Sequence, residues 1–252
     1  MGTANARSTI SDEEWAVRVD LAALYRLVAL EGWDDMLDTH ISGRVPGPDH
    51  HFLINPYGMM FEEITASSLI KIDVDGNKLS ASEYEVNQAG FTIHSAVHMA
   101  RSDANFVIHL HTENGIAVSC QENGLLPINQ TALSVYGEIT YHDYEGIALD
   151  LAERERLIAD LGDSNAMLLR NHGTLACGPN AGGVWQKIYR LETACAIQIK
   201  ALSGGGSLTP IPQNILEQRR AGSTTDSLRR RGDFVWPAML RRLDRIDPGY
   251  RA

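Results

Sequence analysis

Cysteine is scarce in this chain of 252 residues. The three cysteines are Cys120, Cys177 and Cys195, and no two of them form a CxxC pair. An odd, widely spaced set provides neither a disulfide framework nor a cysteine-based metal site. It is typical of a protein kept in a reducing compartment, so we expect a cytoplasmic location.

Long apolar runs are also missing. No run of apolar residues approaches the roughly 20 that a bilayer-spanning helix needs. The N-terminal segment MGTANARSTISDEEW lacks the apolar stretch of a signal peptide. The GxGxxG, Walker and GxSxG motifs are absent as well. We therefore expect no membrane partner, and no nucleotide-loop or serine-hydrolase chemistry.

The chain has no excess of positive charge. Its net charge of −10 argues against nucleic acid as the main partner. The charge is unevenly distributed, because residues 203–252 contain nine arginines and five acidic residues and so carry +4, which leaves −14 for the remainder. We expect this arginine-rich tail to dock on the acidic body of its own or a neighbouring subunit, with RNA binding as the weaker alternative.

Helical and strand-like patterns alternate irregularly along the chain. We expect an N-terminal extension over residues 1–14, one domain over 15–203, and a tail over 204–252 with a terminal amphipathic helix. Because the pattern lacks regular βαβ repeats, it predicts a single layered α/β domain with a largely antiparallel or mixed sheet. The expected helices are 12–31, 89–101, 113–122, 149–161 and 181–203; the expected strands are short ones within 39–75, then 104–112, 139–144 and 166–172.

Three histidines carry the strongest chemical signal. His109 and His111 lie two residues apart in the strand-like segment FVIHLH, so their side chains point to the same face. His172 ends the apolar segment AMLLRNH and is followed directly by Gly173. Three neutral imidazoles would leave a zinc-like ion with open positions for water or substrate. The pattern therefore predicts a catalytic metal site.

Other histidines offer alternatives. His109 and His111 alone could be two half-buried side chains, but the polar residues Thr112, Glu113 and Asn114 that follow them favour a metal site. His94 and His98 have the i, i+4 spacing of a zinc helix but lack the glutamate of HExxH, so we expect them to line a helix face. His142, in YHDYEG, either lines a cleft or satisfies a buried loop.

Two turn segments contain groups that could bind an anion. One is INPYG, with Asn55 and Gly58, and the other is HISGR, with Arg44. Free turn amides together with a guanidinium can hold a carboxylate or phosphate. The alternative for Arg44 is an ordinary pairing with the acidic surface.

The motifs THISGR, INPYG, AGFTIHSAVH, DANFVIHLHT and LLRNHG together resemble the class II aldolase/adducin superfamily over about residues 15–202. The resemblance implies a three-layer α/β/α domain around a mostly antiparallel sheet. It also implies a homotetramer with the active site at a subunit interface. His109, His111 and His172 match the three metal histidines of the family. The implied cofactor is a divalent ion, for which we expect Zn²⁺ first, with Mn²⁺ or Fe²⁺ as alternatives.

Several positions depart from the sugar-phosphate aldolases of that family. Gly90 stands where those enzymes have a zinc-binding glutamate, and His40 replaces an asparagine of their phosphate loop. Gln88 and Ala89 replace two phosphate-binding serines. A glutamate of the methylthioribulose-phosphate dehydratase branch is missing near Thr131. The pattern is closest to the adducin-like bacterial branch, and the complete histidine set favours an enzyme.

We expect a metal-dependent carbon–carbon lyase that performs aldol cleavage or decarboxylation. Its substrate would be a small, unphosphorylated hydroxy, keto or aromatic acid, and the ion would stabilise an enolate as a Lewis acid. We expect His40 to be catalytic, and Tyr136 or Tyr141 to protonate the carbanion. The expected substrate-binding residues are Arg44, Asn55, Gly58 and Gly90.

Two other functions remain open on sequence grounds. Fe²⁺ on the three histidines could support oxygenase chemistry, although two histidines with one carboxylate are more usual for iron. Alternatively, the chain is a non-catalytic binding protein of adducin type, with a structural or vestigial metal.

Overall fold

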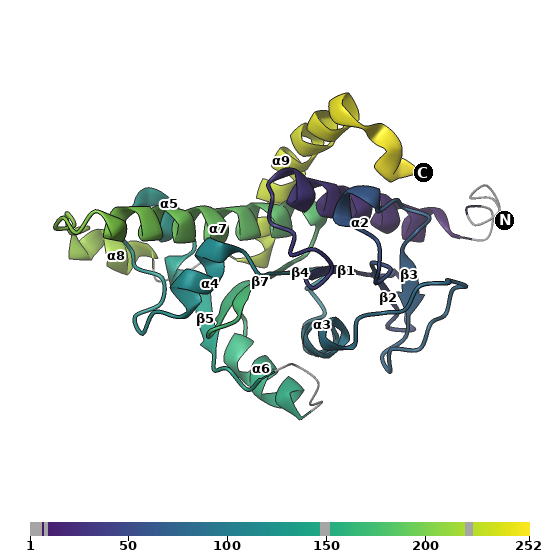
Figure 1. Ribbon diagram of the computed structural model, residues 1–252, viewed down its shortest axis with the longest axis horizontal. Helices are drawn as coiled ribbons and strands as arrows, with labels where there is room; N and C mark the ends of the chain where they lie inside the picture. The colour runs from purple at the N-terminus through teal and green to yellow at the C-terminus, as the bar shows by residue number, and fades with distance from the viewer. Residues whose placement is uncertain (1–6, 8–9, 147–151, 220–223) are drawn as a thin grey trace.

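The computed structural model describes residues 7, 10–146, 152–219 and 224–252. In these residues seven strands form a sheet in the order β3-β2-β1-β4-β7-β6-β5 (Figure 1). The strands are β1 (His40–Arg44), β2 (Phe52–Ile54), β3 (Ile70–Ile72), β4 (Phe106–Leu110), β5 (Ile139–His142), β6 (Ala166–Leu169) and β7 (Gly173–Gly178).

Helices cover both faces of this sheet. Helices α2 and α7 lie on one face, and α3 and α6 lie on the other, with α9 packed outside α7 (Figure 1). The arrangement confirms the three-layer α/β/α fold. The helices are α2 (Asp12–Leu30), α3 (Gln88–Ala100), α4 (Glu113–Ser119), α5 (Gln130–Leu133), α6 (Glu153–Leu161), α7 (Ala181–Ser203), α8 (Gln213–Arg219) and α9 (Thr225–Ile246), with 3-10 turns η1 (Phe61–Glu63), η2 (Tyr136–Glu138) and η3 (Pro248–Arg251).

Strand β4 lies in the middle of the sheet, between β1 and β7. Both of these pairings are antiparallel, as are β1–β2, β2–β3 and β6–β7. Strands β5 and β6 are parallel, so the sheet is mixed rather than the mostly antiparallel sheet that the resemblance implies. The register places His40 of β1 and Leu175 of β7 on either side of His109.

The face of the sheet that carries His109 follows from strand alternation. Ile108 packs into the large core beneath α2 and α7. Val107 and Leu175 instead pack with Ile93 of α3 in a second core on the opposite face. His109 is two residues from Val107 and in register with Leu175, so it points toward the α3 face.

Local sequence signals set the ends of the two longest helices of the domain. The Ser11 side chain accepts a hydrogen bond from the Glu14 amide at the start of α2, and Gly32 follows that helix with φ +68°. The Asn180 side chain caps α7 in the same way by accepting from the Gly183 amide. The expected helices 12–31 and 181–203 are confirmed.

Two other expectations need correction or restriction. The strand expected at 166–172 ends at Leu169, because Asn171 adopts φ +55° in a tight turn that reverses the chain into β7. Strand β7 itself was not expected. Helix α6 begins at Glu153, and the expected start at residue 149 lies outside the described residues, as do positions 1–6 and 8–9 of the N-terminal extension.

The tail packs on its own chain. Helix α9 starts at Thr225, earlier than the expected terminal helix, and lies against α7 and α2. Trp236 is buried in the main core and its Nε1 donates to Asp20 Oδ1 at 2.8 Å. Arg242 forms an ion pair with Glu31 at 2.6 Å. Among the described helices, none combines the length and the hydropathy needed to cross a bilayer.

Candidate metal centre

The three histidines converge on one point. His109 lies in β4, His111 follows the strand directly, and His172 lies in the turn between β6 and β7. The Nε2 atoms are 2.8 Å apart for His109 and His111, 3.1 Å for His111 and His172, and 3.2 Å for His109 and His172. Tetrahedral zinc with Zn–N bonds of about 2.1 Å holds its nitrogens about 3.4 Å apart. The spacing therefore fits three ligands of one divalent ion.

The other ring nitrogens fix the tautomers. His109 Nδ1 donates to the Thr174 carbonyl at 3.0 Å, and His111 Nδ1 lies 3.1 Å from Asp35 Oδ2. Both contacts leave the Nε2 lone pair directed at the point of convergence, as is usual for metal-binding histidines. Burial and the neighbouring imidazoles hold the pKa of His109 well below its ordinary value and lower the pKa of His172 to about 4. Both rings are therefore neutral near pH 7, as ligation requires.

His40 lies beside this group and against Gly90. Its ring centroid is 5.4 Å from that of His109 and 4.9 Å from that of His94. A Cβ atom built on Gly90 would lie only 2.6 Å from His40 Cδ2, so the imidazole fills the space that a side chain at position 90 would need. Among the described residues neither nitrogen of His40 has a hydrogen-bond partner. Burial, assisted by His111 and His172, lowers the pKa of His40 to about 3.

A buried chain of hydrogen bonds next to His40 joins Ser42 of β1 to two histidines of α3. His98 Nδ1 donates to the Ala104 carbonyl at 2.9 Å, so its Nε2 accepts from the Ser42 hydroxyl at 2.7 Å. The same hydroxyl oxygen must then accept from His94 Nδ1 at 2.6 Å. This leaves a lone pair on His94 Nε2, which is buried and has no partner among the described residues. The His94 ring lies next to that of His40, with 4.9 Å between the ring centroids. His94 and His98 therefore form the expected helix face.

On the opposite side of the sheet, the buried carboxyl group of Glu192 forms hydrogen bonds with residues next to His111 and close to His172. Glu192 of α7 accepts hydrogen bonds from the hydroxyls of Thr112, which caps α4 directly after His111, and Thr174 of β7. Burial raises the pKa of Glu192 to about 7. Sequence reasoning missed this residue, although a lone glutamate seven residues after Trp185 on the apolar face of α7 was a usable signal.

Asp35 was also missed, and the sequence around it gives no signal. It belongs to the loop between α2 and β1, and its contact with His111 depends on the fold alone.

Within one chain, Arg44 lies away from His109, His111 and His172. Arg44 lies four residues along β1 from His40, about 13 Å at the usual strand rise. Its guanidinium donates to the backbone carbonyls of His98 and Arg101, the latter at 3.1 Å. It thus binds the carbonyls at the end of α3 and is already engaged there.

The two expected turn residues after β2 lie toward the His40 end of β1. Asn55 follows Ile54, which is in register with Ser42. Its Oδ1 accepts from the buried Tyr25 hydroxyl at 2.9 Å, and this bond anchors the turn. Gly58 has φ +117° in an exposed bend, a conformation that requires glycine. The side chains of Gln88 and Ala89 lie outside the description.

Within one chain, Tyr136 and Tyr141 do not reach the histidines. Tyr141 is in register with Leu168 of β6, which packs into the core beneath α7. Both tyrosines line a cavity of about 630 Å³ on that face. The Tyr141 hydroxyl accepts from the Leu125 amide at 3.1 Å. The pair is thus on the opposite side of the sheet from His40 and His109.

His142 satisfies a buried loop, which is the second of the two sequence interpretations. Its Nδ1 lies 2.7 Å from Asp160 Oδ2, and its Nε2 lies 3.3 Å from Glu153 Oε1. The ring joins the end of β5 to α6 and is occupied at both nitrogens.

Comparison with known proteins identifies the family. The model of the class II aldolase and adducin N-terminal domain matches residues 19–199. A protein of Caulobacter vibrioides that is assigned by name to the class 2 aldolases is 54% identical over 251 residues, which are 98% of this chain and 96% of that protein. Alpha-adducin of Rattus norvegicus is 42% identical over 206 residues, which are 81% of this chain and 27% of adducin.

Solved structures identify the same family. An aldolase II superfamily protein from Pseudomonas syringae superposes with a TM-score of 0.90 at 48% identity, covering 98% of this chain and 99% of that one. The L-fuculose 1-phosphate aldolase from Glaciozyma antarctica PI12 superposes with a TM-score of 0.81 at 26% identity, covering 96% and 93%. The chain belongs to the class II aldolase and adducin family.

Proposed function

We propose that the protein is a metal-dependent carbon–carbon lyase whose divalent ion is held by His109, His111 and His172. The observation that carries the proposal is the convergence of three Nε2 atoms within 3.2 Å of one another, with Nδ1 of two rings engaged elsewhere. The aldolase names of relatives that match nearly the whole chain support a lyase. The ion, Zn²⁺ or alternatively Mn²⁺ or Fe²⁺, would polarise the substrate as a Lewis acid and stabilise an enolate.

His40 takes the proton-transfer role in this proposal. It is buried next to His109, and no described group engages either of its nitrogens. Its neighbour His94 also has an unpartnered Nε2 among the described residues, so no described group holds a proton on His40 and its nitrogens would be available for proton exchange with the substrate. Gly90 supplies the space for the ring.

The proposed substrate class rests on two groups that are not available at the metal centre. A glutamate at position 90 is absent, and Arg44 is committed to the end of α3. We propose a small, unphosphorylated hydroxy, keto or aromatic acid that would contact the turn of Asn55 and Gly58. Aldol cleavage and decarboxylation share the enolate, and both fit this site.

Either of the two expected tyrosine proton donors, Tyr136 or Tyr141, would have to come from a second subunit. Tyr136 and Tyr141 lie on the face of the sheet opposite the histidines, so only a neighbouring chain could present them to the site. We therefore propose a homotetramer in which the pocket of one subunit faces the histidines of the next.

Metal analysis tests the proposal. Protein purified without chelators should contain about one divalent ion per chain by mass spectrometry of the elements. A His109→Ala/His111→Ala variant should contain almost none, and His51→Ala, which removes a histidine outside the centre, should retain it. Absence of metal from both the wild type and the double variant would refute the site and favour an adducin-type binding protein.

Activity assays then separate the reactions. With mandelate-like or catechol-like acids under anaerobic conditions, release of CO₂ or an aldehyde supports the lyase. Oxygen consumption that depends on Fe²⁺ and the same substrate would overturn it in favour of an oxygenase.

A further inference from the structure

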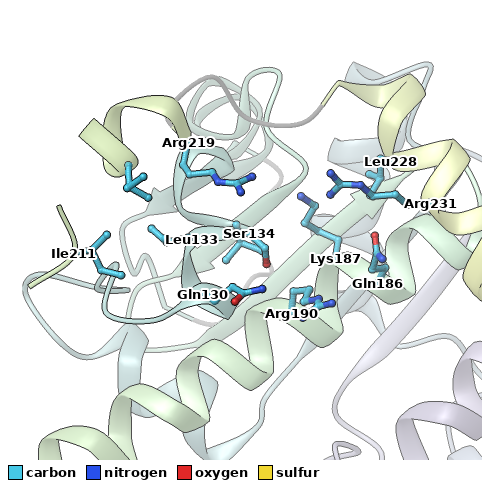
Figure 2. A pocket seen from close by; sticks show the side chains of 12 residues that line it. Gln130, Leu133, Ser134, Gln186, Lys187, Arg190, Ile211, Arg219, Leu228 and Arg231 are labelled. Carbon is cyan, nitrogen blue, oxygen red and sulfur yellow. The ribbon is translucent and has the colours of Figure 1, made fainter. Parts of the chain in front are cut away.

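A second cavity lies on the α7 side of the sheet, opposite the face that carries His109. Its volume is about 620 Å³, within the range of small-ligand sites. Residues from α5, α7, α8 and α9 line it, so the tail helices complete it. Figure 2 shows its side chains.

Four cationic side chains meet in this cavity: Lys187 and Arg190 of α7, Arg219 of α8 and Arg231 of α9. Figure 2 shows the guanidinium groups of Arg219 and Arg231 directed toward each other across the cavity, with the Lys187 amine between them. The chain as a whole has a net charge of −10. A group of cations drawn from three separate helices is therefore not a reflection of overall composition.

Little negative charge compensates this group. Lys187 is buried and forms an ion pair with Glu138. Among the described residues, no ion pair is found for Arg190, Arg219 or Arg231. Like charges brought together in this way repel one another unless an anion joins them, and the positive charge of Arg231 indeed adds to burial in lowering the pKa of Lys187.

The remaining lining favours a small organic ligand. Gln130 and Ser134 add neutral hydrogen-bonding groups, and aliphatic side chains such as Leu133 and Ile215 complete the wall. Arginine forks match the paired oxygens of phosphate and carboxylate groups. We propose that this cavity binds a small organic polyanion with phosphate or carboxylate groups, at a site separate from the metal centre.

Titration calorimetry tests this with two probes, inorganic phosphate and glutarate, on the metal-loaded protein at constant ionic strength. The wild type should bind at least one of them saturably, and the preferred probe identifies the type of anion. Arg219→Gln/Arg231→Gln should raise the Kd by about tenfold or more, because two charge-assisted contacts are lost. Both side chains are exposed, so the variant should fold.

Two controls locate the binding. Arg241→Gln removes an exposed charge of α9 that does not line the cavity, and it should leave the Kd unchanged. His109→Ala/His111→Ala should also retain binding, so this result does not depend on the lyase proposal.

Three outcomes would overturn the inference. They are no saturable binding of either probe by the wild type, equal binding by the double arginine variant, and loss of binding only in the histidine variant. If neither probe binds and the arginine variant instead changes the sedimentation behaviour, the cavity is a contact between copies of the chain.

Discussion

The imidazole of His40 occupies the space above Gly90, where a Cβ atom would lie 2.6 Å from its Cδ2 atom. These two positions, 50 residues apart in sequence, therefore constrain each other. The ring can lie beside His109 only because α3 has no side chain at position 90. The constraint gives a direct test of whether the two residues act as a pair.

Gly90→Ala should destabilise the protein by up to about 2 kcal/mol. Alanine is favoured over glycine in a helix by about 1 kcal/mol, but overpacking against the buried ring costs about 1–3 kcal/mol. In a His40→Ala background the ring is gone, and the same substitution should become neutral or stabilising. Urea denaturation of the four proteins gives the coupling energy, which we expect to reach at least about 1 kcal/mol.

The control for this cycle is Gly206→Ala, a position where a Cβ would have no atom within 4 Å. It should not respond to the residue at position 40. A Gly90→Ala effect of the same sign and size in both backgrounds would show that His40 does not fill this space.

Asp35→Ala should weaken metal binding without removing a ligand. The Asp35 carboxylate lies 3.1 Å from His111 Nδ1 and orients the ring. Loss of such a partner typically costs about 10–100-fold in metal affinity. Competition with a chromophoric chelator would measure the change, with Asp34→Ala as the matched control. Equal affinities for the two variants would mean that the contact does not orient His111.

Glu192 should make stability fall as the pH rises. Its pKa is raised from 4.5 to about 7, so between these values the folded state holds a proton that the unfolded state has lost. The free energy of unfolding therefore decreases with pH across this window, by up to about 3 kcal/mol from this group. Buried histidines with lowered pKa values, such as His98 at about 3, act in the opposite direction, so the wild-type curve alone is not diagnostic.

The Glu192→Gln variant isolates the effect. Glutamine keeps a polar group between Thr112 and Thr174 but does not titrate. Urea denaturation in EDTA should find that the variant gains stability relative to the wild type as the pH rises from 4.5 to 8. A difference that stays constant over this range would mean that Glu192 titrates normally.

The sequence predicted the parts of the centre that depend on local pattern. Strand periodicity placed His109 and His111 on one face, and the helix expected over 181–203 matches the bounds of α7. The third ligand was expected at a strand end and lies in a turn. The αL conformation of Asn171 divides the apolar segment into two strands, and periodicity alone does not reveal it.

The parts that depend on pairing between distant segments could not be predicted. The register of β1 against β4 decides that His40 lies beside His109 and that Arg44 lies at the end of α3. A guanidinium next to a turn suggests an anion site in the sequence, but here two backbone carbonyls accept from one terminal nitrogen of Arg44. Tyr141 likewise sits one residue from His142, and strand alternation puts the two on opposite faces.

The contact between α7 and α9 gives a last prediction. Gly182 and Gly232 bring the two backbones together: a Cβ on Gly182 would lie 2.7 Å from Trp236 Cβ, and one on Gly232 would lie 2.9 Å from the Gly182 carbonyl carbon. Backbone atoms cannot move aside as a side chain can, so Gly232→Ala should separate the helices and destabilise the protein by about 2–4 kcal/mol.

Arg241→Ala, an exposed change on the same helix, should stay within about 0.5 kcal/mol of the wild type. Urea denaturation and the intrinsic tryptophan fluorescence, to which Trp236 buried at this contact contributes, should report the separation together. If Gly232→Ala were as stable as the wild type with unchanged fluorescence, α9 would not be held against α7 in solution. In that case the tail could not complete the cationic cavity, since Arg231 precedes Gly232 on the same turn of the helix.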